Sequence, residues 1–298
     1  AWLTAVADAL DANVTELVAI ADSETSLGTV RLTGEVARTS GQLRLFAKVI
    51  TEGSYLEAVI DHADPASTPP KPDLRRILRP IGPVAVFSAS NFPFAFSVAG
   101  GDTASALAVG CPVVVKAHSG HIRLSERTAE IVTDALAKAG APEGIFALVS
   151  GREAGTALVQ DPAIKAVGFT GSIPGGRALF DLAASRPEPI PFYGELGSLN
   201  PVVITAEALA ERGRQLAAGL AGSFTMGAGQ FCTKPGLVFI PAGTDFASHL
   251  AEASKDKPTA AMLTERIAEA YPDGLRNVAD QPGVAVVSGT VQQDSLAD

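Results

Sequence analysis

Residues 83–116 read PVAVFSASNFPFAFSVAGGDTASALAVGCPVVVK, and this stretch decides the fold. It begins with a strand-like apolar run over 84–89 and ends with another over 112–116, and a helix-like stretch of small residues over 98–109 separates them. Strand–helix–strand units of this size form right-handed crossovers between parallel strands. The segment therefore predicts the start of a parallel sheet.

The alternation of strand and helix patterns continues to residue 196. Further strands are expected at 145–149, 164–170 and 192–196, and further helices at 122–139, 153–160 and 175–184. Gly140 and Pro142 supply a stop signal behind the first of these helices. We predict an α/β fold with a doubly wound parallel sheet, in which ligands bind beyond the carboxyl ends of the strands.

Two segments precede this sheet. Residues 1–52 predict helices, and the apolar side chains between Trp2 and Val18 form one amphipathic stripe. Residues 56–79 instead begin with alternating apolar positions and then carry several prolines. This change of pattern predicts a protruding two-stranded hairpin.

A new pattern begins after the sheet, with a strand expected at 202–205 and a helix at 207–224. We place the domain boundary near Gly197, so that the first domain covers 1–196 and the second covers 197–298.

Composition excludes several classes of protein. The chain has 298 residues, 47% of them hydrophobic and 18% charged, which is typical of a folded globular protein. Its net charge of −9 argues against nucleic acid or an anionic membrane as a partner. The sequence lacks a membrane-spanning stretch and the pattern of a signal peptide, so we expect a cytoplasmic protein whose two cysteines stay reduced.

The strongest chemical signal is Cys232 in the stretch GAGQFCTKPG at 227–236. Glycines leave the sulfur accessible, and Lys234 together with backbone N–H groups can favour the nucleophilic thiolate. The alternative is a small buried residue, which is what the apolar surroundings of Cys111 predict for that cysteine.

Two polar residues follow predicted strands. Glu195 lies at the end of the last strand, where a carboxylate can activate water as a general base, and its alternative is a solvated loop residue. Asn91 follows the first strand, and its amide can donate to an oxyanion while Pro93 stiffens the turn. The alternative for Asn91 is an ordinary turn asparagine.

Three residues suggest a bound nucleotide. Gly171 and Ser172 stand between a strand and a helix, where backbone amides can approach a phosphate. Lys116 ends the second strand and can reach ribose hydroxyls or a 2′-phosphate. The G-x-G-x-x-G fingerprint is missing from the first strand–helix turn, which disfavours an ordinary Rossmann site. His118 and His121 lack companion ligands, so no metal is predicted.

Taken in order, these segments resemble the aldehyde dehydrogenase superfamily. The matching segments are Ser-Asn-Phe-Pro at 90–93, Val-Val-Lys at 114–116, Phe-Thr-Gly-Ser at 169–172, Glu-Leu-Gly at 195–197 and Gly-Gln-Phe-Cys at 229–232. The sequences of residues 74–83, 189–195 and 230–235 are similar to those of the bacterial 2-oxoglutarate semialdehyde (2,5-dioxovalerate) dehydrogenases.

The resemblance implies an aldehyde dehydrogenase-like fold, with a cofactor-binding domain and part of a second α/β catalytic domain. It implies that Cys232 attacks the aldehyde, that Asn91 and the backbone N–H of Cys232 hold the oxyanion, and that Glu195 activates the hydrolytic water. The hairpin at 56–79 resembles the family's oligomerisation hairpin, so a homodimer or homotetramer is implied.

The resemblance also implies NADP or NAD as the cofactor, with Lys116, Gly171 and Ser172 in contact with it. Ser119 and Arg152 can join Lys116 around a 2′-phosphate, which favours NADP or dual use. An anionic semialdehyde needs a nearby arginine. Those considered are Arg75, Arg76, Arg177, Arg186, Arg212 and Arg214.

One departure leaves an alternative open. The family carries a Glu-x-Phe-Gly-Pro segment behind its cysteine, and none occurs between Cys232 and Asp298. Because family chains also extend beyond both ends of this one, we expect a fragment. The alternative function is therefore a nucleotide-binding or assembly fragment without turnover. A cysteine hydrolase is a weaker third interpretation, since no histidine stands near Cys232 in sequence.

Overall fold

The computed structural model describes residues 1–288, which form two compact units. The first unit comprises Ala1–Glu24 and Gly28–Leu196, and the second comprises Thr25–Leu27 and residues 197–288.

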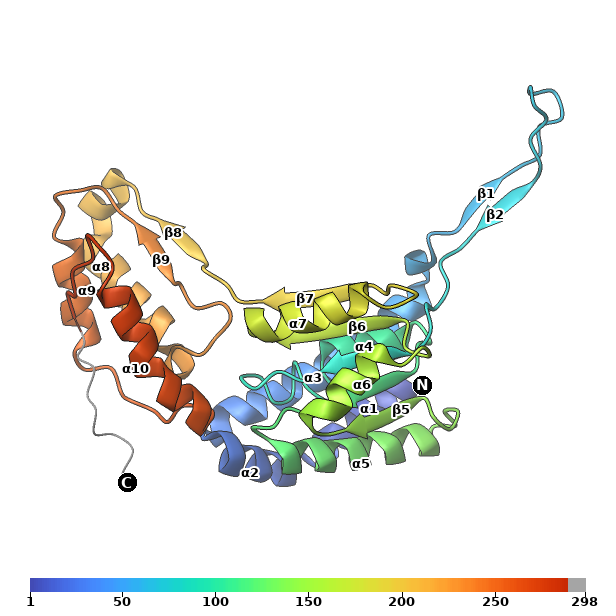
Figure 1. Cartoon of the computed structure of the whole chain (residues 1–298), viewed down its shortest axis with the longest axis horizontal. Helices are drawn as coiled ribbons and strands as arrows, with labels where there is room; N and C mark the ends of the chain where they lie inside the picture. Colours follow the sequence, from blue (N-terminus) through green and yellow to red (C-terminus); the bar gives the residue numbers. More distant parts are fainter. Residues whose placement is uncertain (289–298) are drawn as a thin grey trace. The chain divides into compact units, whose positions relative to one another are not determined.

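A parallel sheet forms the centre of the first unit (Figure 1), with the strand order β5-β4-β3-β6-β7. The strands are β3 (Val84–Phe87), β4 (Val113–Lys116), β5 (Phe146–Val149), β6 (Ala166–Gly171) and β7 (Phe192–Leu196). All neighbouring strands in this sheet pair in parallel, which confirms the prediction. The strand order reverses between β3 and β6, so the favoured place for a ligand is beyond the carboxyl ends of these two strands.

Helices cover both faces of the sheet (Figure 1). On one face lie α4 (Gly101–Ala108) and α5 (Ile122–Lys138), and on the other lie α6 (Arg152–Gln160) and α7 (Ile173–Ala184). Phe87 and Val167 pack in one buried cluster with Val159 of α6 and Ala183 of α7. The doubly wound architecture is therefore confirmed.

The amino-terminal segment corrects one detail of the sequence interpretation. The expected single stripe is divided between α1 (Trp2–Ala12) and α2 (Val14–Thr25), and α3 (Thr29–Glu52) follows. Asn13 separates the first two helices and donates its side-chain N–H to the carbonyl of Ala9, 2.8 Å away. This side-chain bond competes with helix continuation.

Two predicted helix starts are also wrong. The helix expected from residue 98 begins at Gly101, because the chain turns tightly before it: a Cβ on Gly100 would lie 2.4 Å from the carbonyl oxygen of Ala95. The helix expected from Gly175 begins at Ile173, because Ser172 caps it by accepting from the Gly175 N–H at 3.3 Å.

The predicted hairpin is present and extends away from the sheet (Figure 1). It follows the short 3-10 helix η1 (Ser54–Leu56), and its strands β1 (Val59–Asp61) and β2 (Leu74–Arg76) pair in an antiparallel manner. Ile60 and Leu74 are 57% and 56% exposed, so the hairpin carries apolar surface that nothing in its own unit covers.

The second unit begins with β8 (Pro201–Val203), which pairs in parallel with β9 (Leu237–Phe239). Its other elements are α8 (Ala206–Thr225), the 3-10 turn η2 (Met226–Gly229), α9 (Phe246–Ser254) and α10 (Glu265–Ala279). Ile204, Ala217 and Phe246 form its buried centre. The elements β9, α9 and α10 were not predicted from the sequence.

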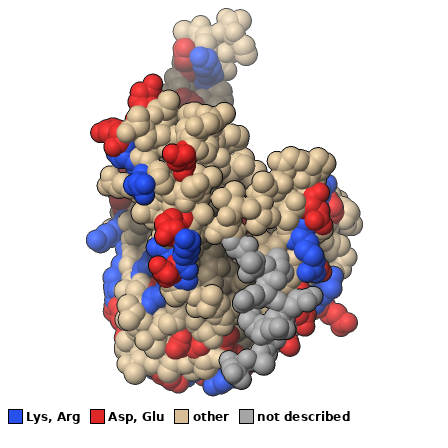
Figure 2. Space-filling view, turned by 90° about the vertical axis from the view of Figure 1, so that its left-hand side faces the viewer, with Lys and Arg blue, Asp and Glu red and all other residues tan. Residues whose placement is uncertain are grey.

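Figure 2 shows acidic and basic side chains interspersed over the face that it displays. Across residues 1–288, none of the helices combines the length and the apolar character needed to cross a membrane.

Candidate functional site

The thiol of Cys232 is exposed and lies just after a strained turn. Gly227, Ala228 and Gly229 have φ values of 58°, 55° and 71°, in the left-handed region that favours glycine. Ala228 accepts this conformation at a cost of about 1 kcal/mol. The turn brings the chain back into a tight loop, and the following cysteine is presented to solvent. Cys111, in contrast, is 2% exposed, as predicted.

The cysteine loop is fixed from the segment that precedes β8. Asn200 donates its side-chain amide to the carbonyl of Cys232 at 2.7 Å and to that of Lys234 at 2.9 Å. Ser198 donates its hydroxyl to the same carbonyl of Cys232. The Gly236 N–H donates to the Leu199 carbonyl at 2.9 Å. These bonds hold the backbone that carries the thiol, although sequence analysis assigned no role to Asn200.

Replacing Asn200 with alanine is expected to destabilise the second unit by about 1–3 kcal/mol, because two hydrogen bonds are lost: the Lys234 carbonyl loses its side-chain donor, and the Cys232 carbonyl keeps only that of Ser198. The alanine would also inherit a φ of 44°, which asparagine tolerates better. Chemical denaturation followed by circular dichroism measures the change. Ser198→Ala removes one of these bonds without a φ penalty and should cost less; equal stability of Asn200→Ala and the parent would contradict the assignment.

Asn91 and Glu195 both lie at the carboxyl-end edge of the sheet in the first unit. Asn91 follows β3 in a turn, and Glu195 is the penultimate residue of β7, paired in register with Thr170. Residues two apart on a strand share a face. Glu195 therefore lies on the same face as Thr170 and Gly168, which is the face covered by α4.

Asp102 in the first turn of α4 lies over that face. A Cβ on Gly168 would be 3.1 Å from the Asp102 carboxylate, so the absent side chain makes room for it. Burial, and then the negative charge of Glu195, raise the pKa of Asp102. Asp102 is nevertheless exposed by its accessible surface, so water screens both effects and keeps them small. Sequence analysis missed Asp102, because its nearness to Glu195 depends on the sheet.

The raised pKa of Asp102 predicts a pH-dependent stability. The folded protein binds this proton more tightly than the unfolded chain, so the contribution is present at low pH and is lost as pH rises from about 4 through the raised pKa. Asp102→Asn should make the fall in unfolding free energy over that window shallower. Denaturation at several pH values tests this, with Asp134→Asn on the outer surface of α5 as control; an unchanged slope would refute it.

Lys116 ends β4, is half-buried and points toward α6, where a Cβ on Gly155 would lie 3.4 Å from its side chain. Gly155 thus lets α6 approach the lysine stem. Burial lowers the pKa of Lys116. Ser119 and Arg152 lie beyond the ends of β4 and β5 and are exposed, so the structure puts these three residues at the same edge of the sheet.

Gly171 and Ser172 stand at the switch from β6 to α7, and both are exposed. Ser172 is the N-cap residue of a 12-residue helix. Its first turn presents backbone N–H groups and the positive end of the helix dipole, which suit an anion. Ligands of doubly wound sheets bind at the carboxyl ends of the strands. All seven candidate residues of the first unit lie at this edge of the sheet: Asn91, Lys116, Ser119, Arg152, Gly171, Ser172 and Glu195. Cys232 belongs to the second unit.

Comparison with known proteins decides the family. The family described as "Aldehyde dehydrogenase family" matches residues 1–268. The chain belongs to the aldehyde dehydrogenase family.

Two curated relatives narrow the similarity further. The chain is 52% identical over 290 residues to alpha-ketoglutaric semialdehyde dehydrogenase 2 of Azospirillum brasilense, with 95% of this chain and 55% of the relative covered. It is 46% identical over 277 residues to alpha-ketoglutaric semialdehyde dehydrogenase of Acinetobacter baylyi, with 92% and 53% covered. The chain thus spans about half the length of these relatives.

Solved structures support the same fold. A salicylaldehyde dehydrogenase from Pseudomonas putida G7 superposes with a TM-score of 0.81 at 20% identity, over 97% of this chain and 60% of that one. A NAD-dependent benzaldehyde dehydrogenase from Corynebacterium glutamicum gives 0.79 at 23% identity, over 98% and 62%. The aldehyde dehydrogenase-like fold predicted from the sequence is confirmed.

In this aldehyde dehydrogenase chain, the loop after β3 is held by residues that sequence analysis did not select for that role. Glu35 of α3 is 5% exposed and accepts the N–H groups of Phe94 and Ala95 at 2.9 and 3.0 Å. Burial raises the pKa of Glu35. His121 bonds to the Ala89 carbonyl at 2.9 Å through a ring nitrogen. Among residues 1–288, no three His, Cys, Asp or Glu side chains gather to hold a metal ion.

Two of the arginines considered for the substrate have structural roles. Arg186 is buried and donates to the carbonyls of Val159 and Ile164, both at 3.0 Å. Arg177 pairs with Asp181 one turn along α7, at 2.8 Å. The guanidinium of Arg186 is thus held by two backbone carbonyls inside the first unit, which makes Arg186 a poor candidate for binding a substrate.

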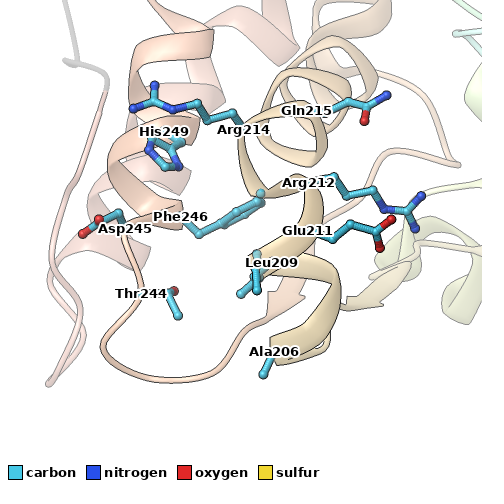
Figure 3. A pocket seen from close by; sticks show the side chains of 12 residues that line it. Ala206, Leu209, Glu211, Arg212, Arg214, Gln215, Thr244, Asp245, Phe246 and His249 are labelled. Atoms are coloured by element: carbon cyan, nitrogen blue, oxygen red, sulfur yellow. The ribbon is translucent and has the colours of Figure 1, made fainter.

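Figure 3 shows a hollow between α8 and α9 in the second unit, with a volume of about 690 Å³. Arg214 and His249 extend toward each other on one side, and Glu211 and Arg212 point away on the other. Arg212 has a φ of −146°, so α8 is kinked there. None of the lining residues belongs to the cysteine loop. We therefore do not assign aldehyde chemistry to this hollow.

Proposed function

We propose that the protein oxidises an aldehyde to a carboxylic acid with NADP or NAD, and that its substrate is 2-oxoglutarate semialdehyde. The observation that carries the proposal is the exposed Cys232 on a loop that Ser198 and Asn200 hold in place. The names of the two relatives, at 52% and 46% identity, support the substrate. No observation favours a nucleotide-binding module without turnover.

The first step is attack by the Cys232 thiolate on the aldehyde carbon. A carbon–sulfur bond forms as the carbonyl π electrons move to oxygen, giving a thiohemiacetal. The side-chain amide of Asn91 and the backbone N–H of Cys232 donate to that oxygen. Both donors stand on firmly held backbone, since Glu35 fixes the loop of Asn91 and Asn200 fixes the loop of the cysteine.

A bound nicotinamide would supply the acceptor for the hydride of this carbon. The carbon then remains on Cys232 as a thioester. Glu195 accepts a proton from water as the water oxygen attacks the thioester carbon, and the carbon–sulfur bond breaks to release the acid and the thiolate. The exposed position of Glu195 at the end of β7 leaves water free to reach it.

The edge of the sheet fits a dinucleotide. The capped start of α7 at Ser172 offers backbone donors to the pyrophosphate, and Lys116 offers a cation to the adenosine ribose or its 2′-phosphate. Ser119 and Arg152, at the same edge, can join Lys116 around a 2′-phosphate, which favours NADP.

Replacing Lys116 with alanine is expected to weaken NADP⁺ binding about tenfold or more, because a charge-assisted contact from a half-buried lysine is lost. NAD⁺ binding should weaken less if the lysine contacts the 2′-phosphate. Titration calorimetry measures both, and Lys138→Ala in the last turn of α5 serves as control. Unchanged affinity for NADP⁺ would exclude the proposed contact.

The substrate proposal is tested by a panel measured on the natural protein that contains this chain. Reduction of NADP⁺ or NAD⁺ with 2-oxoglutarate semialdehyde is compared with reduction by pentanal, which has the same chain length and no charge. A kcat/KM at least tenfold higher for the semialdehyde is the expected result. Equal values would overturn the substrate, and no reduction with any aldehyde would overturn the activity.

We also propose that copies of the protein associate through the hairpin of β1 and β2, whose apolar side chains are exposed.

A further inference from the structure

One face of α3 carries two arginines on either side of a buried glutamate. Arg31, Glu35 and Arg38 are spaced four and three residues apart, which places them one above the other on the same side of a helix. Glu35 shows which side this is, because its carboxylate accepts the backbone N–H groups of Phe94 and Ala95. The two arginines therefore face the loop that carries Asn91.

Their contacts reach the residues next to the proposed oxyanion donor. Arg31 donates to the backbone carbonyl of Asn91. The Arg31 and Arg38 guanidinium carbons lie 5.2 and 5.6 Å from the centre of the Phe92 ring, and Arg38 lies 5.3 Å from that of Phe96. Phe92 and Phe96 pack edge-to-face, with centroids 5.4 Å apart. The result is an aromatic platform with two guanidinium groups over it.

The surface formed by Arg31, Arg38 and the two phenylalanine rings carries a net positive charge. Arg31 and Arg38 contribute two positive charges, and Glu35 offsets one at most. Within residues 1–288, Arg38 forms no ion pair with an acidic side chain, and it is exposed. Its charge does favour the ionised form of the Glu35 carboxylate and so opposes the rise in the pKa of Glu35. In a chain with a net charge of −9, this local excess is unusual.

We propose that Arg38, with Arg31 beside it, binds the 2-oxo carboxylate end of the substrate while the aldehyde end lies at Asn91. This inference rests on the proposed function and adds the residues that select the substrate. A guanidinium fork matches a carboxylate through two parallel hydrogen bonds, and an adjacent ketone oxygen can accept another. The apolar carbons between the two ends would lie along Phe92.

The proposed substrate is short, so its two ends must bind to groups that lie close together. In an extended five-carbon semialdehyde, the aldehyde and carboxylate carbons are about 5 Å apart, as the carbon–carbon bond length dictates. The Arg38 guanidinium carbon lies 5.6 Å from the centre of the Phe92 ring, and Phe92 directly follows Asn91 in the chain. Sequence analysis did not consider Arg31 or Arg38 for the substrate, because their nearness to Asn91 depends on how α3 packs.

The test compares Arg38→Met with Lys48→Met in the natural protein. Both changes remove one positive charge from an exposed position on α3. For Arg38→Met we expect kcat/KM for 2-oxoglutarate semialdehyde to fall about ten- to hundredfold, mainly through KM, while the value for pentanal changes less than about threefold. Lys48→Met should change neither, and Arg38→Lys should restore part of the loss. A parallel fall for both aldehydes would show that Arg38 only packs against the aromatic rings and would overturn the proposal, as would an unchanged ratio.

A binding measurement separates this inference from the proposed activity. The probe is 2-oxoglutarate, which has the same 2-oxo carboxylate end and needs no turnover. Calorimetric titration should give a Kd about tenfold or more weaker for Arg38→Met than for Lys48→Met. Equal affinities, or no binding by the unmodified protein, would overturn the assignment of Arg38. Absence of dehydrogenase activity with normal Arg38-dependent binding would overturn the proposed function alone.

Discussion

Cys232→Ala is expected to lower the rate of aldehyde oxidation by at least about a thousandfold, measured as reduction of NADP⁺ or NAD⁺ by the natural protein. The proposed thiohemiacetal and thioester both form on this sulfur, and alanine offers no nucleophile in its place. The other cysteine cannot substitute, because Cys111 is 2% exposed at the start of β4.

Cys111→Ala is the matched control. It also removes a thiol, but from the core, so a modest loss of stability with near-normal turnover is expected. Normal turnover by Cys232→Ala, or an equal loss in the two variants, would contradict the assignment of the nucleophile.

Glu195→Gln is expected to separate the two halves of the reaction. Glutamine has nearly the shape of glutamate but cannot accept the proton from water, so the thioester should hydrolyse about a hundred- to ten-thousandfold more slowly. Hydride transfer precedes that step and should remain. Stopped-flow absorbance should therefore show one equivalent of reduced cofactor formed rapidly, followed by a slow steady state.

Glu188→Gln provides the comparison. Glu188 is an exposed carboxylate before β7 that pairs with Lys165 at 3.5 Å, and its loss should leave both phases unchanged. If the rapid phase of Glu195→Gln slowed as much as the steady state, Glu195 would act before or during hydride transfer rather than on water.

The sheet could be predicted because its signals are local. The strands β3, β4 and β5 are short, mainly apolar runs, and Gly140 and Pro142 mark where α5 stops. The errors in the predicted helix bounds also have local causes. A side-chain hydrogen bond of Asn13 separates α1 from α2, and the Ser172 cap places the start of α7 two residues earlier than predicted.

Some residues of the candidate site could likewise be predicted from the sequence, and others could not. Asn91, Lys116 and Glu195 could be selected because each follows or ends a strand, and the topology rule brings such positions to one edge. Asn200 and Arg38 could not, because their importance comes from contacts with segments 32 and 54 residues away, at Cys232 and Phe92. A sequence pattern reports the period of an element but not which distant element it meets.

The most direct test of the central claim is to locate the acyl group. Glu195→Gln protein is mixed with 2-oxoglutarate semialdehyde and NADP⁺, quenched with acid after one turnover, digested and analysed by mass spectrometry. We expect the mass of the acyl group on the peptide that contains Cys232, in an amount equal to the reduced cofactor formed. Reduced cofactor without an adduct on Cys232, or an adduct on another residue, would contradict the proposed mechanism.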